Sequence, residues 1–251
     1  MKGRFFVTLD PEHDDRAYLD AAGARHVRAL RLVPGDAVGA IVAPGRERAA
    51  TIARLERERV VLALGVELPA AGRDPRSARV LALALGDPAR MDLVVEKATE
   101  LGASALQPFV AARSQARTLA ATRRERWRRI ARTACEQCGR TVEPEIRPCL
   151  DFAALVAACA RVQTVWLLLP AGASDRHAGP ATPTPATQTD SAREPGLLLV
   201  VGPEGGLDDG ENQRLLAAGA TPLTLGRRVL RFETAAIAGL SVALSRFPDE
   251  T

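Results

Sequence analysis

Two glycine-containing segments near the C-terminal end of the chain have the residue types of a ligand-binding site. The first, Gly202-Pro203-Glu204-Gly205-Gly206, directly follows the apolar run 197–201 and precedes a polar, helix-like segment. Glycines at the end of a buried strand expose backbone groups at the edge of a sheet, where open α/β sheets bind their ligands. An ordinary tight turn explains this loop equally well when it is considered alone.

The second segment, residues 225–235, places charged side chains at the beginning of a predicted helix. Gly226 again permits close approach of the backbone, and Arg231, Glu233 and Thr234 fall where a helix has free N–H donors and a partial positive charge. The alternative is a capped helix with Glu233 in its first turn and surface arginines. Two such loops in neighbouring strand–helix units favour a ligand pocket.

Missing motifs exclude several kinds of cofactor site. The chain has no G-x-x-x-x-G-K-[ST] loop for a triphosphate and no G-x-G-x-x-G dinucleotide fingerprint, and it also lacks H-E-x-x-H and G-x-S-x-G. Cys135 and Cys138 form a C-x-x-C within a helical pattern, but no second such pair follows. The cysteines therefore predict packed residues rather than a metal site.

Composition predicts a globular protein with a local cluster of arginines. The 251 residues carry a net charge of +4, with no apolar run of 18 residues and no signal-peptide pattern, so we expect a cytoplasmic protein without membrane contact. Six arginines between positions 123 and 132 are offset within that segment only by Glu125. Such a cluster is the electrostatic footprint of phosphate contact, although a solvated helix face has the same composition.

The elements that position these segments form two regions. Residues 1–70 show short apolar runs separated by Pro-Gly turns and one helix-like piece, which predicts a small β-barrel; residues 71–78 resemble a linker. From residue 79 onward strands and helices alternate, which predicts an α/β domain with a mainly parallel sheet. Within it, the Pro-rich and Thr-rich segment 171–196 predicts a flexible excursion without chemistry. The predicted strands are 4–9, 38–42, 51–55, 60–66, 80–85, 105–110, 164–169, 197–201 and 222–225, and the predicted helices are 20–31, 88–101, 119–139, 152–160, 208–218 and 233–246.

These motifs together resemble those of the small-subunit ribosomal RNA uridine-N3 methyltransferases of the SPOUT superfamily. The resemblance covers nearly the whole chain and is carried by both glycine-containing segments. Phe232 stands where threonine is common in that family, and Arg227 where proline is frequent. The further matching motifs are His26-Val-Arg-Ala-Leu-Arg-Leu32, Glu96-Lys-Ala-Thr-Glu-Leu-Gly102 and Ala134-Cys-Glu-Gln-Cys-Gly-Arg140.

The resemblance implies a fold, a cofactor and partners. It implies a SPOUT-type α/β domain (79–251) with a C-terminal trefoil knot, preceded by a PUA-like RNA-binding β-barrel (1–70), in a homodimer. The implied cofactor is S-adenosylmethionine, with no metal, and the implied partner is 16S ribosomal RNA or the small ribosomal subunit. The residues implied to bind the cofactor are Leu168, Leu169, Pro170, Gly202, Pro203, Glu204, Gly205, Gly206, Leu225, Gly226, Val229, Leu230 and Thr234.

The implied reaction methylates N3 of a uridine, which carries a proton at neutral pH. Glu233 is then the candidate proton acceptor, and Arg231 stabilises charge on the base oxygens; alternatively, Glu233 positions Arg231. Two other functions remain open, namely a non-catalytic RNA-binding assembly factor and a SPOUT methyltransferase that acts on another RNA. The candidate RNA-binding residues are Arg4, Arg28, Arg31, Arg113, Arg124, Arg128 and Arg129.

Overall fold

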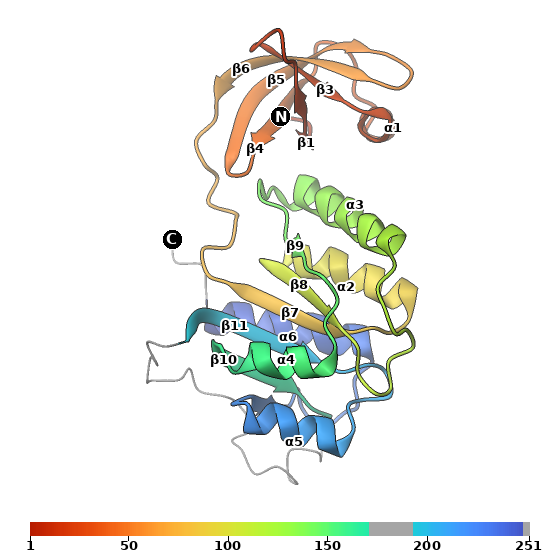
Figure 1. The fold of residues 1–251 in the computed structure, drawn as a ribbon. Coiled ribbons are helices and arrows are strands. Elements are labelled where there is room, and N and C mark those ends of the chain that lie inside the picture. Colours follow the sequence, from red (N-terminus) through yellow and green to blue (C-terminus); the bar gives the residue numbers. More distant parts are fainter. Residues whose placement is uncertain (171–192, 248–251) are drawn as a thin grey trace. The chain divides into compact units, whose positions relative to one another are not determined.

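The computed structural model describes residues 1–170 and 193–247, whose contacts divide the chain into two compact units (Figure 1). The first unit comprises Met1–Asp74 with Arg132–Glu143, and the second comprises Pro75–Ala131 with Pro144–Thr251. Helix α3 (Ala121–Cys138) therefore contributes residues to both units. The domain limits 1–70, 71–78 and 79–251 stay a prediction. Residues 171–192 of the expected excursion 171–196 lie outside the described residues, and the expectation is wrong for 194–196, which belong to a strand that pairs within the sheet.

The first unit is built on a mixed six-stranded sheet in the order β1-β4-β5-β6-β3-β2. Strand β1 pairs parallel to β4, and the other pairs are antiparallel. One face of the sheet is apolar because alternate residues along each strand point the same way, so that Phe5, Val38 and Leu62 form a core with Val27 of the helix. Its elements are β1 (Arg4–Phe6), β2 (Thr8–Leu9), β3 (Arg16–Leu19), α1 (Ala21–Ala29), β4 (Ala37–Ala43), β5 (Arg46–Leu55) and β6 (Val60–Glu67).

The second unit contains a six-stranded parallel sheet in the order β12-β10-β11-β7-β8-β9. On one side of β7 the chain adds β8 and then β9 in sequence order, whereas on the other side β11 lies between β7 and the earlier strand β10, and β12 forms the edge. The strands are almost continuously apolar because helices cover both faces of a parallel sheet. They are β7 (Arg79–Ala84), β8 (Ala105–Phe109), β9 (Glu145–Ile146), β10 (Val162–Leu168), β11 (Glu194–Val201) and β12 (Thr221–Leu223).

Helices complete two cores, one on each face of the parallel sheet. Leu81, Leu199 and their same-facing neighbours pack against α2, α6 and the first part of α3, whereas Val80 and Val200 face α4 and α5. The residues that follow one another along a strand thus enter different cores. The helices are α2 (Pro88–Glu100), α4 (Phe152–Cys159), α5 (Asp209–Ala217) and α6 (Phe232–Arg246).

The predicted helices and strands are found, but β5 begins at Arg46 rather than at residue 51, and the predicted strand 4–9 is divided into β1 and β2. Two short strands, β3 and β9, escape the sequence analysis because four and two residues are too few to show a period. The order of the strands in the parallel sheet is likewise invisible in the sequence. Among the described helices, none is long and apolar enough to cross a membrane.

Candidate functional site

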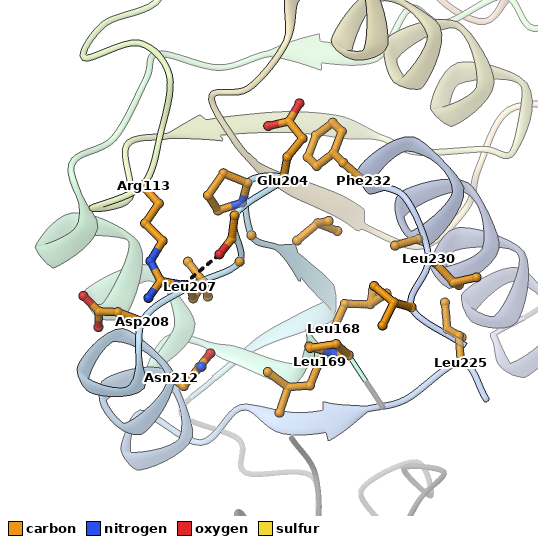
Figure 2. Close-up of a pocket in the computed structure, with 18 of the residues that line it drawn as sticks. Arg113, Leu168, Leu169, Glu204, Leu207, Asp208, Asn212, Leu225, Leu230 and Phe232 are labelled. Atoms are coloured by element: carbon orange, nitrogen blue, oxygen red, sulfur yellow. Dashed lines mark hydrogen bonds between the residues drawn. The ribbon is translucent and has the colours of Figure 1, made fainter. Parts of the chain in front are cut away.

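A cavity of about 600 Å³ lies in the second unit where β10, β11 and β12 end (Figure 2). The carboxyl ends of parallel strands lie at one edge of the sheet, so the loops that follow them meet there. Three segments form most of the wall, and each was predicted to bind a ligand. They are Leu168, Leu169 and Pro170 after β10; Gly202, Pro203, Glu204, Gly205 and Gly206 after β11; and Leu225, Gly226, Val229 and Leu230 after β12.

The glycines serve two different purposes in this wall. Gly206 has a φ of +70° and Gly226 a φ of +92°, both in the left-handed region, and a Cβ at either position meets no atom within 4 Å. Gly206 ends a tight turn in which its amide donates to the carbonyl of Pro203 at 2.8 Å, and Gly226 lies in a bend of the chain; both lie beside open space. At Gly202, in contrast, a Cβ would lie 2.9 Å from Cγ of Leu207, so glycine is required for close packing.

The cavity wall also contains polar residues that the sequence analysis did not select. Asp208 caps α5, and its carboxylate accepts a hydrogen bond from the amide of Glu211 while the Glu211 carboxylate accepts one from the amide of Asp208, at 2.7 and 3.0 Å. This is a capping box, and the D-x-x-E spacing at 208–211 was a readable signal for it. The other additional lining residues are Val201, Leu207, Asp209, Asn212, Arg228, Phe232 and Ala235.

The loop after β8 is bonded to this wall at two points. The second carboxylate oxygen of the buried Glu211 accepts a hydrogen bond from the amide of Ala112 at 2.7 Å. The Arg113 guanidinium donates to the carbonyl of Gly205 at 2.8 Å and itself lines the cavity (Figure 2). Arg113, predicted as an RNA contact, therefore also forms part of the pocket.

Glu204 makes a contact outside the cavity. One carboxylate oxygen accepts a hydrogen bond from the amide of Asp87 at 2.9 Å, at the N-terminus of α2. Figure 2 shows the Glu204 carboxylate directed away from the cavity interior. The long range of this contact, from residue 87 to residue 204, explains why no sequence pattern revealed it.

The three charged or polar residues at the start of α6 lie beside the cavity rather than in its wall. Leu230, just before α6, and Phe232, its first residue, line the cavity. Arg231, Glu233 and Thr234 are not among the described residues that line it. Arg231 is the exposed N-cap residue of α6 and makes no side-chain cap. The Glu233 side chain is only 15% exposed, and its carboxylate lies 3.8 Å from the guanidinium of Arg90 on α2.

The arginines of α3 have more counter-charges than the sequence indicated. In the second unit Asp92 of α2 lies 2.6 Å from Arg126 and 3.8 Å from Arg123, so an acid outside the segment also offsets the cluster. Glu125 itself pairs with Arg128 at 3.4 Å. Tertiary contacts placed the additional acid there. Of the candidate RNA contacts on this helix, Arg129 is exposed and Arg124 half-buried.

The candidate RNA contacts of the first unit are partly engaged by the protein. Arg4 donates to the buried carboxylate of Glu47 at 3.0 Å, and Arg28 donates to the backbone carbonyls of Glu56 and Arg57. Arg31 is exposed, with a φ of +55° after the end of α1. Arg31 is therefore the more accessible cation.

Two further sequence motifs meet in the first unit. His26 of α1 lies 3.1 Å from the carboxylate of Glu136, whose other oxygen accepts the amide hydrogen of Phe6, also at 3.1 Å. Burial raises the pKa of Glu136. The neighbouring Cys135 is fully buried, and this burial raises the pKa of its thiol to about 12. Within residues 1–170 and 193–247, no group of three His, Cys, Asp or Glu side chains has the arrangement of a metal site.

A parallel α/β unit with a glycine-lined cavity at its sheet edge is typical of an enzyme domain that binds a small organic ligand. Comparison with known protein families identifies the kind of enzyme domain: the RNA methyltransferase domain family matches residues 74–244. The chain belongs to this family.

Individual relatives match over nearly their full length. The Bacillus subtilis protein named ribosomal RNA small subunit methyltransferase E is 29% identical over 95% of this chain and 94% of its own. A crystal structure of the protein with the same name from Neisseria gonorrhoeae, bound to S-adenosylmethionine, superposes with a TM-score of 0.81 and 26% identity over 99% of both chains. A Legionella pneumophila protein solved in complex with S-adenosylmethionine gives a TM-score of 0.80 and 29% identity over 96% of both chains.

Proposed function

We propose that this protein transfers a methyl group from S-adenosylmethionine to N3 of a uridine in the 16S RNA of the small ribosomal subunit. The observation that carries the proposal is the cavity at the ends of β10, β11 and β12, in a chain of the RNA methyltransferase domain family. The names and bound cofactor of the compared proteins support the substrate and the methyl donor. The uridine-N3 position rests on the resemblance of the sequence motifs.

The residues present fit this cofactor. A volume of about 600 Å³ lies within the range of about 300–1,000 Å³ that is usual for small-molecule pockets. Leucines at 168, 169, 225 and 230 offer apolar walls for an adenine ring, and the loop glycines leave backbone groups accessible. Asp208 and Asp209 suit a ligand ammonium group, while Arg113 suits a carboxylate.

The cofactor, when bound, supplies a methyl group on a sulfonium, which is already an activated leaving group. The chain's own residues then have to align the base with it, and alignment contributes up to about 7–11 kcal/mol to such reactions. We assign Arg231, exposed beside the cavity, to stabilise negative charge on the uracil oxygens, and Glu233 to accept the N3 proton. Thr234, exposed in the first turn of α6, stays a proposed cofactor contact.

The remaining expectations belong to the same proposal. We propose a C-terminal trefoil knot around the cofactor loops, a PUA-like barrel in residues 1–70 and a homodimer that acts in the cytoplasm. RNA phosphates are proposed to contact the exposed Arg31 and Arg129 together with Arg124 and Arg128. Arg113 would then lie where the RNA and the cofactor meet.

Methyl transfer from labelled S-adenosylmethionine to small subunits that lack the modification tests the proposal. Digestion of the RNA to nucleosides should place the label in 3-methyluridine, and R231A and E233Q should lower kcat more than they weaken cofactor binding. Label in another nucleoside or only in another RNA would refute the assigned reaction. A protein that binds subunits but no cofactor would instead be a non-catalytic assembly factor.

A further inference from the structure

The first turn of α2 contacts both loops that border the cavity. Asp87 is the N-cap residue, and its carboxylate accepts hydrogen bonds from the amides of Ala89 and Arg90, both at 3.0 Å. The Asp87 amide itself precedes the helix and has no intrahelical partner to donate to. It donates instead to Glu204 of the first glycine loop.

Gly86 lies directly beside the Glu204 carboxylate. A Cβ at this buried position would lie 2.6 and 2.8 Å from the two carboxylate oxygens, closer than nonbonded atoms can approach. A side chain at residue 86 would therefore displace the flexible end of Glu204 from its hydrogen bond with the Asp87 amide. Its negative charge also lies at the positive end of the α2 dipole.

The second loop is connected through Arg90. The Arg90 guanidinium, in the first turn of α2, lies 3.8 Å from the carboxylate of Glu233, in the first turn of α6. Glu233 follows Leu230 and Phe232, which line the cavity. The carboxylate of this ion pair is mostly shielded from solvent, because the Glu233 side chain is only 15% exposed.

We propose that Glu204 and Arg90 are positioning residues, which bind the two cavity loops to the first turn of α2 and so hold the cofactor pocket in its binding shape. We call Gly86, Asp87, Arg90, Glu204 and Glu233 the α2 anchor. The proposal rests on the proposed function for its effect on the cofactor, but the anchoring itself is a property of the free protein. Glu204 then acts through the backbone of its loop, with its carboxylate directed away from the cavity interior (Figure 2).

Hydrogen–deuterium exchange of the protein without cofactor tests the anchor directly. E204A should increase amide exchange across residues 202–208, because the loop loses its bond to Asp87. E204Q should exchange like the wild type, since its amide oxygen can accept the same hydrogen bond. Likewise, R90A but not R90K should increase exchange near residues 230–234. As a matched control, E145A removes an exposed carboxylate paired with Arg147 and should leave both segments unchanged.

Calorimetric titration with S-adenosylmethionine measures the effect on the pocket. We expect E204A to weaken binding about tenfold, as the loss of one hydrogen bond to a charged acceptor predicts, and E204Q less than threefold. G86A should also weaken binding, but adding G86A to E204A should cost nothing further, because the group it collides with is gone.

Three outcomes overturn the positioning role. They are wild-type exchange in E204A, equal loss of binding in E204Q and E204A, and full additivity of G86A with E204A. If the wild-type protein binds no S-adenosylmethionine, the proposed function fails, and the exchange experiment still decides the anchor.

Discussion

Glu211 offers the sharpest test of how the cavity wall is stabilised. Its buried carboxylate accepts two backbone amides, from Asp208 at 3.0 Å and from Ala112 at 2.7 Å. Hydrogen bonds to charged groups contribute about 1.5–3 kcal/mol each. Ala112 is exposed, so its amide can bind water in the variant. We therefore use the lower value, about 1.5 kcal/mol, for each of the two hydrogen bonds. E211A should therefore lower the free energy of unfolding by about 3 kcal/mol.

Asp151 provides the matched comparison. It is an exposed N-cap residue on α4 of the same unit, with one hydrogen bond, to the amide of Ala154 at 2.7 Å. D151A should cost about 1 kcal/mol, as for other N-caps. The loss of stability in E211Q should fall between those of D151A and E211A. Its side-chain amide keeps one oxygen that can accept a hydrogen bond, but its NH2 group cannot accept the second backbone N–H.

Urea unfolding followed by tryptophan fluorescence is the suitable assay. The chain has two tryptophans, Trp127 and Trp166, and both are buried in the second unit, so the signal reports on the unit that contains Glu211. An unchanged m-value would show that the variants lose stability without a change in the surface exposed on unfolding. The reasoning is refuted if E211A costs no more than D151A.

Two further predictions concern acid stability and RNA binding. The Tyr18 hydroxyl, with the Glu12 amide, lowers the pKa of Asp10 from 3.8 to about 2, so the ionised carboxylate stabilises the first unit above about pH 4 and this stabilisation is lost as the pH falls toward 2. The thermal midpoint of D10N should therefore lie below that of the wild type at neutral pH, and the difference should vanish in that acid range. R129A should weaken RNA binding and reduce the slope of log affinity against log salt by about 0.7–0.9, whereas R126A, already paired with Asp92, should change the slope less.

Each of these has a clear contradicting result. A midpoint difference between D10N and wild type that is the same at all pH values would show that ionisation of Asp10 does not stabilise the fold. An unchanged salt slope in R129A would remove this part of α3 from the RNA surface and leave it a solvated helix face.

The sequence was most informative where the structure depends on local signals. Buried strands and their turns show up as apolar runs ended by glycine, and the α2 N-terminus is marked by Asp87 and Pro88. The cavity could be anticipated because each of its three main segments follows a strand of a parallel sheet. The short strands β3 and β9 could not be anticipated, because they exist through pairing with distant strands.

Contacts between distant residues account for what the sequence analysis missed. Asp92 reaches the α3 arginines from another helix, and Glu211 bonds to Ala112, 99 residues away. Arg90 had no distinguishing pattern, and its relation to Glu233 arises only because α2 and α6 pack on the same face of the sheet.

The sequence by itself determined the elements, the position of the ligand loops and the motifs shared with a methyltransferase family. The reason is that glycine placement, strand periodicity and helix caps act within a few residues of the chain. The direction in which a side chain points within those loops depends on which distant backbone or charge packs against it. For that reason only the tertiary structure decided that Glu204 and Glu233 turn toward the first turn of α2, and that Arg113 joins the wall of the cavity.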